Sequence, residues 1–250
     1  MTTEQEIEAR LQAVAKKARE FQAARAHSTG ARAPVNESPI LVSPDPEMDS
    51  WRAMQADKAR EADHQKKVDD LRLGWNAPLR QVRTKPNLEG PFGDNLEMLT
   101  QRLGNNFTVA LIGPRHNPGK TQLAVELMRA ATANLKTALY VKAIHFFMEI
   151  QDTYGRDRKG GLEGQLQVLR RFSKPWLLVI DEIQERGDTN WEQRLLVTLI
   201  DDRYAATKDT LLVGNFTPEE LQSSLGTSIM ARCTRSGGVI QADWTVSKSP

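Results

Sequence analysis

The sequence contains one cysteine among its 250 residues, and its four histidines are scattered along the chain. A lone cysteine, Cys233, excludes an internal disulfide and a cysteine-rich zinc site, and the histidines show no metal-ligand spacing. No apolar run approaches the roughly 18 residues of a membrane-spanning helix, and the N-terminus lacks the apolar segment of a secretory signal. We therefore expect a cytoplasmic protein in which Cys233 is a small buried residue.

A strong net charge is also missing, because 34 Lys and Arg residues nearly balance 32 Asp and Glu residues and leave +2. Any binding of nucleic acid must therefore come from a local basic patch rather than from the field of the whole chain. The hydrophobic content of 39% and charged content of 26% are ordinary for a folded soluble protein. The length suits one large domain and an appendage.

An apolar run over residues 108–112 breaks into a loop that ends in Gly-Lys-Thr and is followed by a helical apolar pattern. This strand, loop and helix order is typical of a phosphate-binding loop. Backbone N–H groups would face phosphate oxygens, Lys120 would add a positive charge, and the Thr121 hydroxyl would ligate Mg²⁺. The predicted cofactor-binding residues are Gly113, Pro114, Asn117, Pro118, Gly119, Lys120, Thr121 and Gln122.

The predicted loop departs from the usual spacing, since five residues rather than four separate Gly113 from Gly119. Pro118 also has no N–H to offer a phosphate. The alternative interpretation is an ordinary glycine and proline turn before a helix.

A second apolar run, residues 176–180, ends in Asp181 and Glu182. A continuous apolar run is typical of a buried strand in a parallel sheet, and functional groups lie just past the carboxyl ends of such strands. We predict that Asp181 holds Mg²⁺ through water and that Glu182 polarises the water that attacks the terminal phosphate. The alternative is a strand that simply ends in surface acids.

The first 73 residues differ from the rest of the chain. An amphipathic helix is predicted over residues 4–26, a proline- and serine-rich linker over 28–46, and a more charged helix over 47–73. The apolar stripe of the first helix either contacts a partner, or it folds back on its own domain or pairs with the next helix. We place the domain boundary in the irregular segment that follows, giving a docking region, 1–73, and a main domain, 74–250.

Further elements are expected in the main domain. Asp94 is expected to cap a helix that runs to Leu103. Other predicted helices cover residues 144–154, 191–204 and 225–232, and further strands cover 137–141, 210–215 and 239–242. Asn215 ends one strand and is suited either to sensing the terminal phosphate or to a simple turn. A basic, glycine-flanked turn at 155–161 is either a nucleic-acid contact or a solvated loop.

The order of these pieces resembles the DnaC/IstB-like branch of the AAA+ ATPases, the bacterial and phage replicative helicase loaders. The resemblance covers about residues 74–248 and rests on the Gly-Lys-Thr loop, the Asp-Glu strand end, the strand ending in Asn215, and the Leu-Gly-x-x-Ile-x-x-Arg segment that ends at Arg232. It implies an α/β P-loop fold, with a parallel five-stranded sheet flanked by helices and no full lid.

The resemblance also implies roles for single residues. Asn215 matches the first sensor, and Arg232 matches an arginine finger that acts on a neighbouring subunit and so implies self-association. Lys248 lies where the family carries a second-sensor arginine, although lysine lacks the bidentate fork. The implied contacts with single-stranded DNA fall on Phe147, Tyr154, Arg156, Arg158 and Lys159.

The leading hypothesis is therefore an ATP- and Mg²⁺-dependent helicase loader. Residues 1–73 would dock on a hexameric DnaB-type replicative helicase, and the main domain would bind single-stranded DNA and hydrolyse ATP slowly. One alternative is an IstB-type transposition ATPase, which shares the ATPase core. Another is a scaffold that does not hydrolyse nucleotide because its phosphate loop is degenerate. The sequence does not indicate which helicase or transposase is the partner, how many subunits assemble or which nucleotide is preferred. It also does not indicate whether the source is a chromosome or a phage.

Overall fold

The computed structural model describes residues 46–114, 119–154, 161–187 and 189–244. The chain divides into two compact units, residues 1–53 and 54–250. The helix predicted over 4–26 and the linker lie outside the described residues. Helix α2, Pro46–Leu73, agrees with the charged helix predicted over 47–73. Within the described ranges, no helix combines the length and apolarity needed to cross a membrane.

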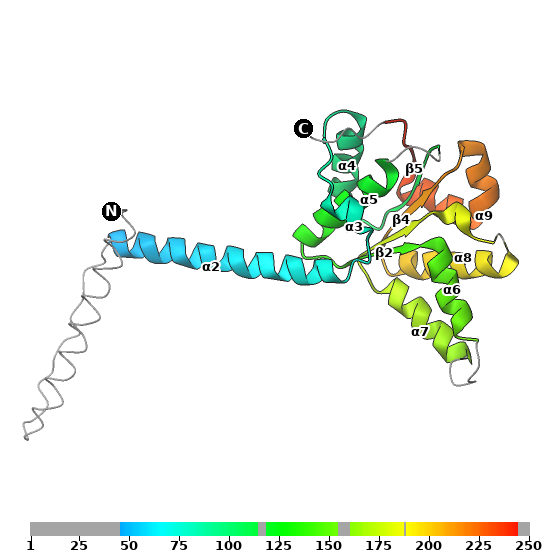
Figure 1. Ribbon diagram of the computed structural model, residues 1–250, viewed down its shortest axis with the longest axis horizontal. Coiled ribbons are helices and arrows are strands. Elements are labelled where there is room, and N and C mark those ends of the chain that lie inside the picture. Colours follow the sequence, from blue (N-terminus) through cyan, green and yellow to red (C-terminus); the bar gives the residue numbers. More distant parts are fainter. Residues whose placement is uncertain (1–45, 115–118, 155–160, 188, 245–250) are drawn as a thin grey trace, which may run out of the picture. The chain divides into compact units, whose positions relative to one another are not determined.

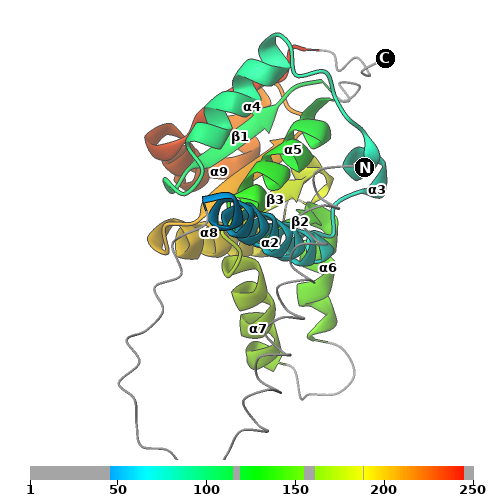
Figure 2. The ribbon, with the colours of Figure 1, turned by 90° about the vertical axis from the view of Figure 1, so that its left-hand side faces the viewer.

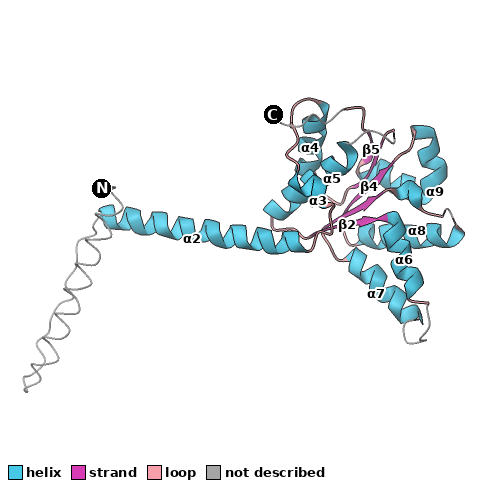
Figure 3. Cartoon of the chain, viewed as in Figure 1, coloured by secondary structure: helices cyan, strands magenta, loops and turns pink. Residues whose placement is uncertain are grey.

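The main unit is an α/β fold built on one sheet (Figures 1 and 3). Its strands are β1 (Thr108–Ile112), β2 (Ala138–Lys142), β3 (Leu177–Asp181), β4 (Asp209–Gly214) and β5 (Gly238–Gln241). The helices are α3 (Leu79–Arg83), α4 (Pro91–Gln101), α5 (Gly119–Ala133), α6 (Ala143–Asp152), α7 (Gly161–Ser173), α8 (Asn190–Ala205) and α9 (Pro218–Ser236), with a short 3-10 helix, η1 (Ile183–Glu185).

All strand pairs in the sheet are parallel, and the spatial order is β2-β3-β4-β1-β5. This confirms the predicted parallel five-stranded sheet. The order places β1, which feeds the predicted phosphate loop, between β4 and β5, with β3 one strand further away. Because every strand points the same way, the residues that follow them gather at one edge of the sheet, here called the carboxyl edge.

Both faces of the sheet are buried, which explains the continuous apolar runs of its strands. Leu177 and Val179 pack with α4 and α5 on one face, whereas Leu178 and Ile180 pack with α6, α7, α8 and α9 on the other. Cys233 lies in this second core, as expected. Figures 1 and 2 both show α6 and α7 lying together and extending beyond the sheet.

Three helices differ from the sequence-based expectations. Helix α4 begins at Pro91, so Asp94 lies inside its first turn and is not its cap. Helix α7 was not predicted, because its two glycines and charged residues resemble a turn. Helix α9 starts earlier than predicted, at a capping box formed by Thr217 and Glu220, and it continues past a kink at Gly226.

Candidate functional site

The phosphate loop begins where β1 ends. Gly113 has a φ of 155°, and a Cβ atom at this position would lie 2.8 Å from the carbonyl oxygen of Ala242. Glycine is therefore required for β1 and the segment after β5 to approach this closely. Pro114 follows and is exposed, and α5 begins at Gly119. Asn117 and Pro118 lie outside the described residues, so their predicted contacts with phosphate stay predictions.

Lys120 is buried at the start of α5, with 4% of its surface exposed. Its Nζ donates to the carbonyl oxygens of Gly113, at 3.2 Å, and Pro114, at 2.7 Å. It forms no ion pair within the part of the chain that the structure describes. Burial lowers the pKa of its ammonium group, partly offset by the more distant charge of Asp181. A buried ammonium ion that forms no direct ion pair favours an anionic ligand at the loop.

Asp181 is the last residue of β3 and is 3% exposed. Its Oδ2 accepts hydrogen bonds from the Thr121 hydroxyl and from the Tyr140 hydroxyl, each at 2.8 Å. Its Oδ1 accepts from the backbone N–H of Glu182 at 2.7 Å. Burial raises the pKa of this carboxyl group, against the lowering effect of these bonds. Its hydrogen-bond donors are all neutral, so among the described residues it forms no direct ion pair.

The donor set around Asp181 fits a magnesium ion. Mg²⁺ takes oxygen ligands and is usually held by one or two protein groups together with substrate phosphates. The Thr121 hydroxyl and the Asp181 carboxylate are such oxygens, and they already lie within hydrogen-bond distance. A cation would also compensate the buried carboxylate. These two residues are those predicted as metal ligands from the sequence.

Glu182 is displayed from a strained backbone. Its φ of 54° lies in the left-handed region, which is uncommon for a residue with a side chain. Its carboxylate forms an ion pair with Lys142, Nζ to Oε2 at 2.8 Å. Strain of this kind persists where surrounding structure holds it and is frequent at functional sites. The two adjacent carboxylates therefore have different partners, Lys142 for Glu182 and the hydroxyl groups of Thr121 and Tyr140 for Asp181.

Two residues of this cluster, Tyr140 and Lys142, were missed by the sequence analysis. They lie on β2, and Lys142 is the register partner of Asp181. Nothing in the sequence around Tyr140 and Lys142 indicates a functional site. Only the pairing of β2 with β3 brings them next to Asp181 and Glu182.

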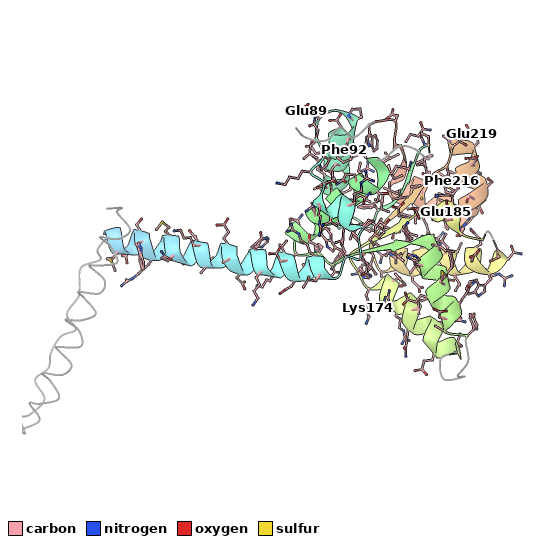
Figure 4. All side chains as sticks on the ribbon, viewed as in Figure 1. Glu89, Phe92, Lys174, Glu185, Phe216 and Glu219 are labelled. Carbon is pink, nitrogen blue, oxygen red and sulfur yellow. The ribbon has the colours of Figure 1, made fainter. Side chains whose placement is uncertain are left out.

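Asn215 follows β4 at the same edge of the sheet. Its backbone N–H donates to Oε1 of Gln184, the residue at the centre of η1, at 2.9 Å. Both residues line a cavity of about 680 Å³, as does Phe216, which Figure 4 labels. The cavity lies between η1 and the first turns of α8 and α9, and its lining is mainly polar. Asn215 is therefore linked to the segment that follows Glu182.

The Gln122 side chain turns away from the loop. Its amide donates to the carbonyl oxygen of Gln81 in α3 and to Glu126. Only its backbone remains available for the predicted contact with a nucleotide.

Arg232 lies in the last part of α9, far from the loop of its own subunit. Ser236, one turn later, donates to its carbonyl oxygen and accepts from the N–H of Thr108, where β1 begins. The Arg232 guanidinium contacts Asp201 of α8, Nε to Oδ1 at 2.6 Å, and lies over the Tyr204 ring. Since β1 separates these contacts from Gly113, Arg232 lies away from the loop of its own chain.

The predicted DNA-contacting residues separate into three groups. Phe147 is 1% exposed and packs against Phe146 and Trp191. A ring buried in this core cannot stack on a base, so the prediction for Phe147 is wrong. Tyr154 is exposed and accepts a hydrogen bond from Trp191, so its ring remains accessible. The third group, Arg156, Arg158 and Lys159, lies outside the described residues, as does Lys248.

Comparisons with known proteins agree with this geometry. The family model described as IstB-like ATP binding protein matches residues 97–235. The replicative helicase loader DnaC of Escherichia coli K12 is 24% identical over 132 residues, which are 53% of this chain and 52% of that protein. An uncharacterised E. coli K12 protein, YdaV, is 28% identical over 120 residues, 48% of this chain and 46% of that protein. The chain therefore spans about half the length of the curated relatives it matches.

Solved structures show the same fold. A crystal structure of the DnaC helicase loader superposes with a TM-score of 0.51 and 14% identity, covering 67% of this chain and 97% of that one. A DnaI structure gives a TM-score of 0.53 at 14% identity, covering 68% and 93%. Domain III of the Thermotoga maritima replication initiation protein DnaA gives 0.52 at 16% identity, covering 64% and 65%. With the parallel sheet, the Gly-Lys-Thr helix start and the buried Asp181 in place, the chain belongs to the IstB-like ATP binding family and has the fold of a DnaC/IstB-like AAA+ ATPase.

Proposed function

We propose that this protein is an ATP-dependent loader of a DnaB-type replicative helicase. The observation that carries the proposal is a pair of buried charges that form no direct ion pair, the ammonium group of Lys120 and the carboxylate of Asp181. A scaffold has no need to bury two such charges, whereas a nucleotide phosphate and its Mg²⁺ would compensate both. The similarity of about half the chain to the loader DnaC supports the choice of substrate and partner.

Each residue of the site has a separate task in this proposal. Lys120 leaves the carbonyl oxygens of Gly113 and Pro114 and contacts the outer phosphates of ATP, and the first turn of α5 adds its N–H groups. Thr121 and Asp181 would hold Mg²⁺, and the ion would neutralise charge on the phosphates. Glu182 accepts a proton from the attacking water, which requires that its carboxylate leave Lys142.

Arg232 completes the site of a neighbouring subunit in this proposal. It reaches the partner's phosphates only if its contact with Asp201 opens, since both side chains are partly buried against each other. Hydrolysis is then slow in isolated subunits and faster in an assembly. Asn215, bonded to η1, senses the terminal phosphate.

The DNA and helicase contacts are assigned to opposite parts of the chain. Single-stranded DNA binds at the outer end of α6 and α7, where Tyr154 offers an exposed ring. Residues 1–73 dock on the helicase. The alternative with specific support is an IstB-type transposition ATPase, since the matching family model carries that name.

Nucleotide binding provides the first test. Titration with a fluorescent ATP analogue and Mg²⁺ should saturate for the wild-type chain, and Lys120→Ala should weaken binding about 10- to 100-fold, the usual value of a charge-assisted contact. Lys85→Ala, which removes an exposed lysine elsewhere, should bind normally. Equal affinity of wild type and Lys120→Ala would contradict the assignment of the loop.

Hydrolysis tests Glu182 separately from binding. Single-turnover hydrolysis by Glu182→Gln should fall about 10²- to 10⁴-fold, because the amide cannot accept the proton from water, while analogue binding persists. Glu185→Gln, three residues later and exposed, is the matched control. A normal rate for Glu182→Gln would remove its proposed role.

Mixing of two inactive variants tests the action of Arg232 on a neighbour. Arg232→Ala retains its own nucleotide loop, and Lys120→Ala retains its arginine, so mixed assemblies should recover part of the lost ATPase activity. Neither variant alone should recover activity at the same total concentration. If mixing restores nothing, Arg232 does not act between subunits.

The choice of partner is tested with the full chain as immobilised bait. A hexameric DnaB-type helicase should be retained, and Leu11→Asp with Val14→Asp, placed on the predicted apolar stripe, should abolish retention. Arg10→Asp, beside the stripe, is the control. Retention of an IstB-type transposase in place of the helicase would favour the alternative function, and retention of neither would contradict the loader.

A further inference from the structure

Three connecting turns lie side by side at the amino edge of the sheet, the edge opposite to the nucleotide site. They are residues 133–137 before β2, 173–176 before β3 and 205–208 before β4. Each carries a lysine, Lys136, Lys174 or Lys208, and none contains an acidic residue. Adjacent parallel strands lie about 4.8 Å apart, so the three lysines form one basic strip. Figure 4 labels Lys174 at this edge, away from Glu185 and Phe216.

Trp176 lies at the centre of the strip and orders two of the lysines. The Nζ of Lys136 lies 4.0 Å from the centroid of the Trp176 ring, and the Nζ of Lys208 lies 3.9 Å from it. Both ammonium groups are therefore held against the same indole ring by cation–π contacts.

The two ammonium groups have no carboxylate partner within the residues that the structure describes. Asp209 adjoins these turns but is buried, and its carboxylate accepts from the backbone N–H groups of Gly104 and Phe107, so it is unavailable to the lysines. Asp202, in the last turn of α8, is exposed and forms no ion pair with Lys136 or Lys208 among the described residues. The strip remains positive even though the chain as a whole is nearly neutral.

The backbone beneath the strip is held firmly by Arg203, which is fully buried. Its guanidinium donates to the carbonyl oxygens of Phe172 at 2.9 Å and Pro175 at 3.0 Å, and its Nε donates to the Thr210 hydroxyl at 2.9 Å. It also donates to the Trp176 carbonyl. Trp176 is thus presented from a fixed turn, so the two lysines are ordered before any ligand arrives.

We propose that this strip, Lys136, Lys174, Trp176 and Lys208, binds the phosphate backbone of a single-stranded nucleic acid. Basic groups that follow the backbone and an aromatic ring that stacks on bases are the two parts of such sites. A single-stranded nucleic acid can contact both ammonium groups at once. When a lysine moves from the Trp176 ring onto a phosphate, it exposes a face of the indole on which a base can stack. An acidic peptide would use the lysines and leave the ring without a function. The strip is separate from Tyr154 and from the nucleotide site.

The test uses the full chain and a fluorescently labelled oligothymidylate, with anisotropy measured over a series of salt concentrations. Lys136→Gln with Lys208→Gln should weaken binding at low salt at least tenfold. Two lost phosphate contacts should also reduce the slope of log K against log salt by about 1.4, since each contributes about 0.7 on single strands. Lys66→Gln with Lys85→Gln, which removes the same charge from exposed positions elsewhere, should leave the slope unchanged.

Two conservative variants distinguish a binding role from a structural one. Lys136→Arg with Lys208→Arg should keep the slope, and Trp176→Phe should keep most of the affinity, because charge and ring face are preserved. A slope unaffected by the glutamine pair, or equally affected by the control pair, would overturn the proposal. Labelled polyglutamate that binds as tightly as the oligonucleotide, with the same loss in the glutamine pair, would overturn it in favour of a protein partner. Binding of the fluorescent ATP analogue should be unchanged in every variant. A loss of oligonucleotide binding can then be separated from a defect of the nucleotide site.

Discussion

The buried carboxylate of Asp181 is the interaction around which the functional edge is built. It receives hydrogen bonds from α5 through Thr121 and from β2 through Tyr140, and so it ties the helix after the phosphate loop to two strands. Together with Lys120 it leaves two opposite charges buried near each other without direct pairing. Burial of an unpaired charge is costly, and a ligand that supplies both counter-charges would bind with that cost already met by the fold.

The two edges of the sheet have different physical characters. At the carboxyl edge, Glu182 is held in a left-handed conformation and its carboxylate lies partly exposed on Lys142. At the amino edge, Arg203 satisfies several backbone carbonyl groups and fixes the turns around Trp176. Parallel strands produce this asymmetry, since all chain reversals into helices occur at one edge and all returns occur at the other.

A continuous set of contacts connects the nucleotide site to the helix that carries Arg232. Arg186, just after η1, donates to Gln193 of α8 at 2.8 Å and contacts the Ser224 carbonyl oxygen, and Gln193 donates to the Leu225 carbonyl oxygen at 2.7 Å. These bonds surround Gly226, where α9 is kinked. A Cβ atom at Gly226 would lie 2.9 Å from the Gln193 amide, so the kink and the contact fit only with glycine. The second half of α9 is thus joined to the residues that follow Glu182.

The amino-acid sequence by itself determined the five strands, the phosphate loop and the acidic strand end. Buried parallel strands must be continuously apolar, and this apolarity ends abruptly at Gly113, which opens the loop that leads to Gly-Lys-Thr, and at Asp181-Glu182. These changes from apolar to polar residues occur within a few positions, so they can be recognised in a single sequence. Helix α7 was missed although Leu162, Leu166 and Leu169 recur at helical spacing, because the glycine-rich turn before it was weighed and this spacing was not.

Only the tertiary structure decided which side chains meet. Tyr140 and Lys142 reach the acidic pair through strand register, Phe147 enters the core because α6 turns that face inward, and Gln122 faces α3. Lys136, Trp176 and Lys208 are far apart in the sequence and unremarkable in type. They come together because β2, β3 and β4 are neighbours, and that neighbourhood is set by long-range pairing that no local pattern encodes.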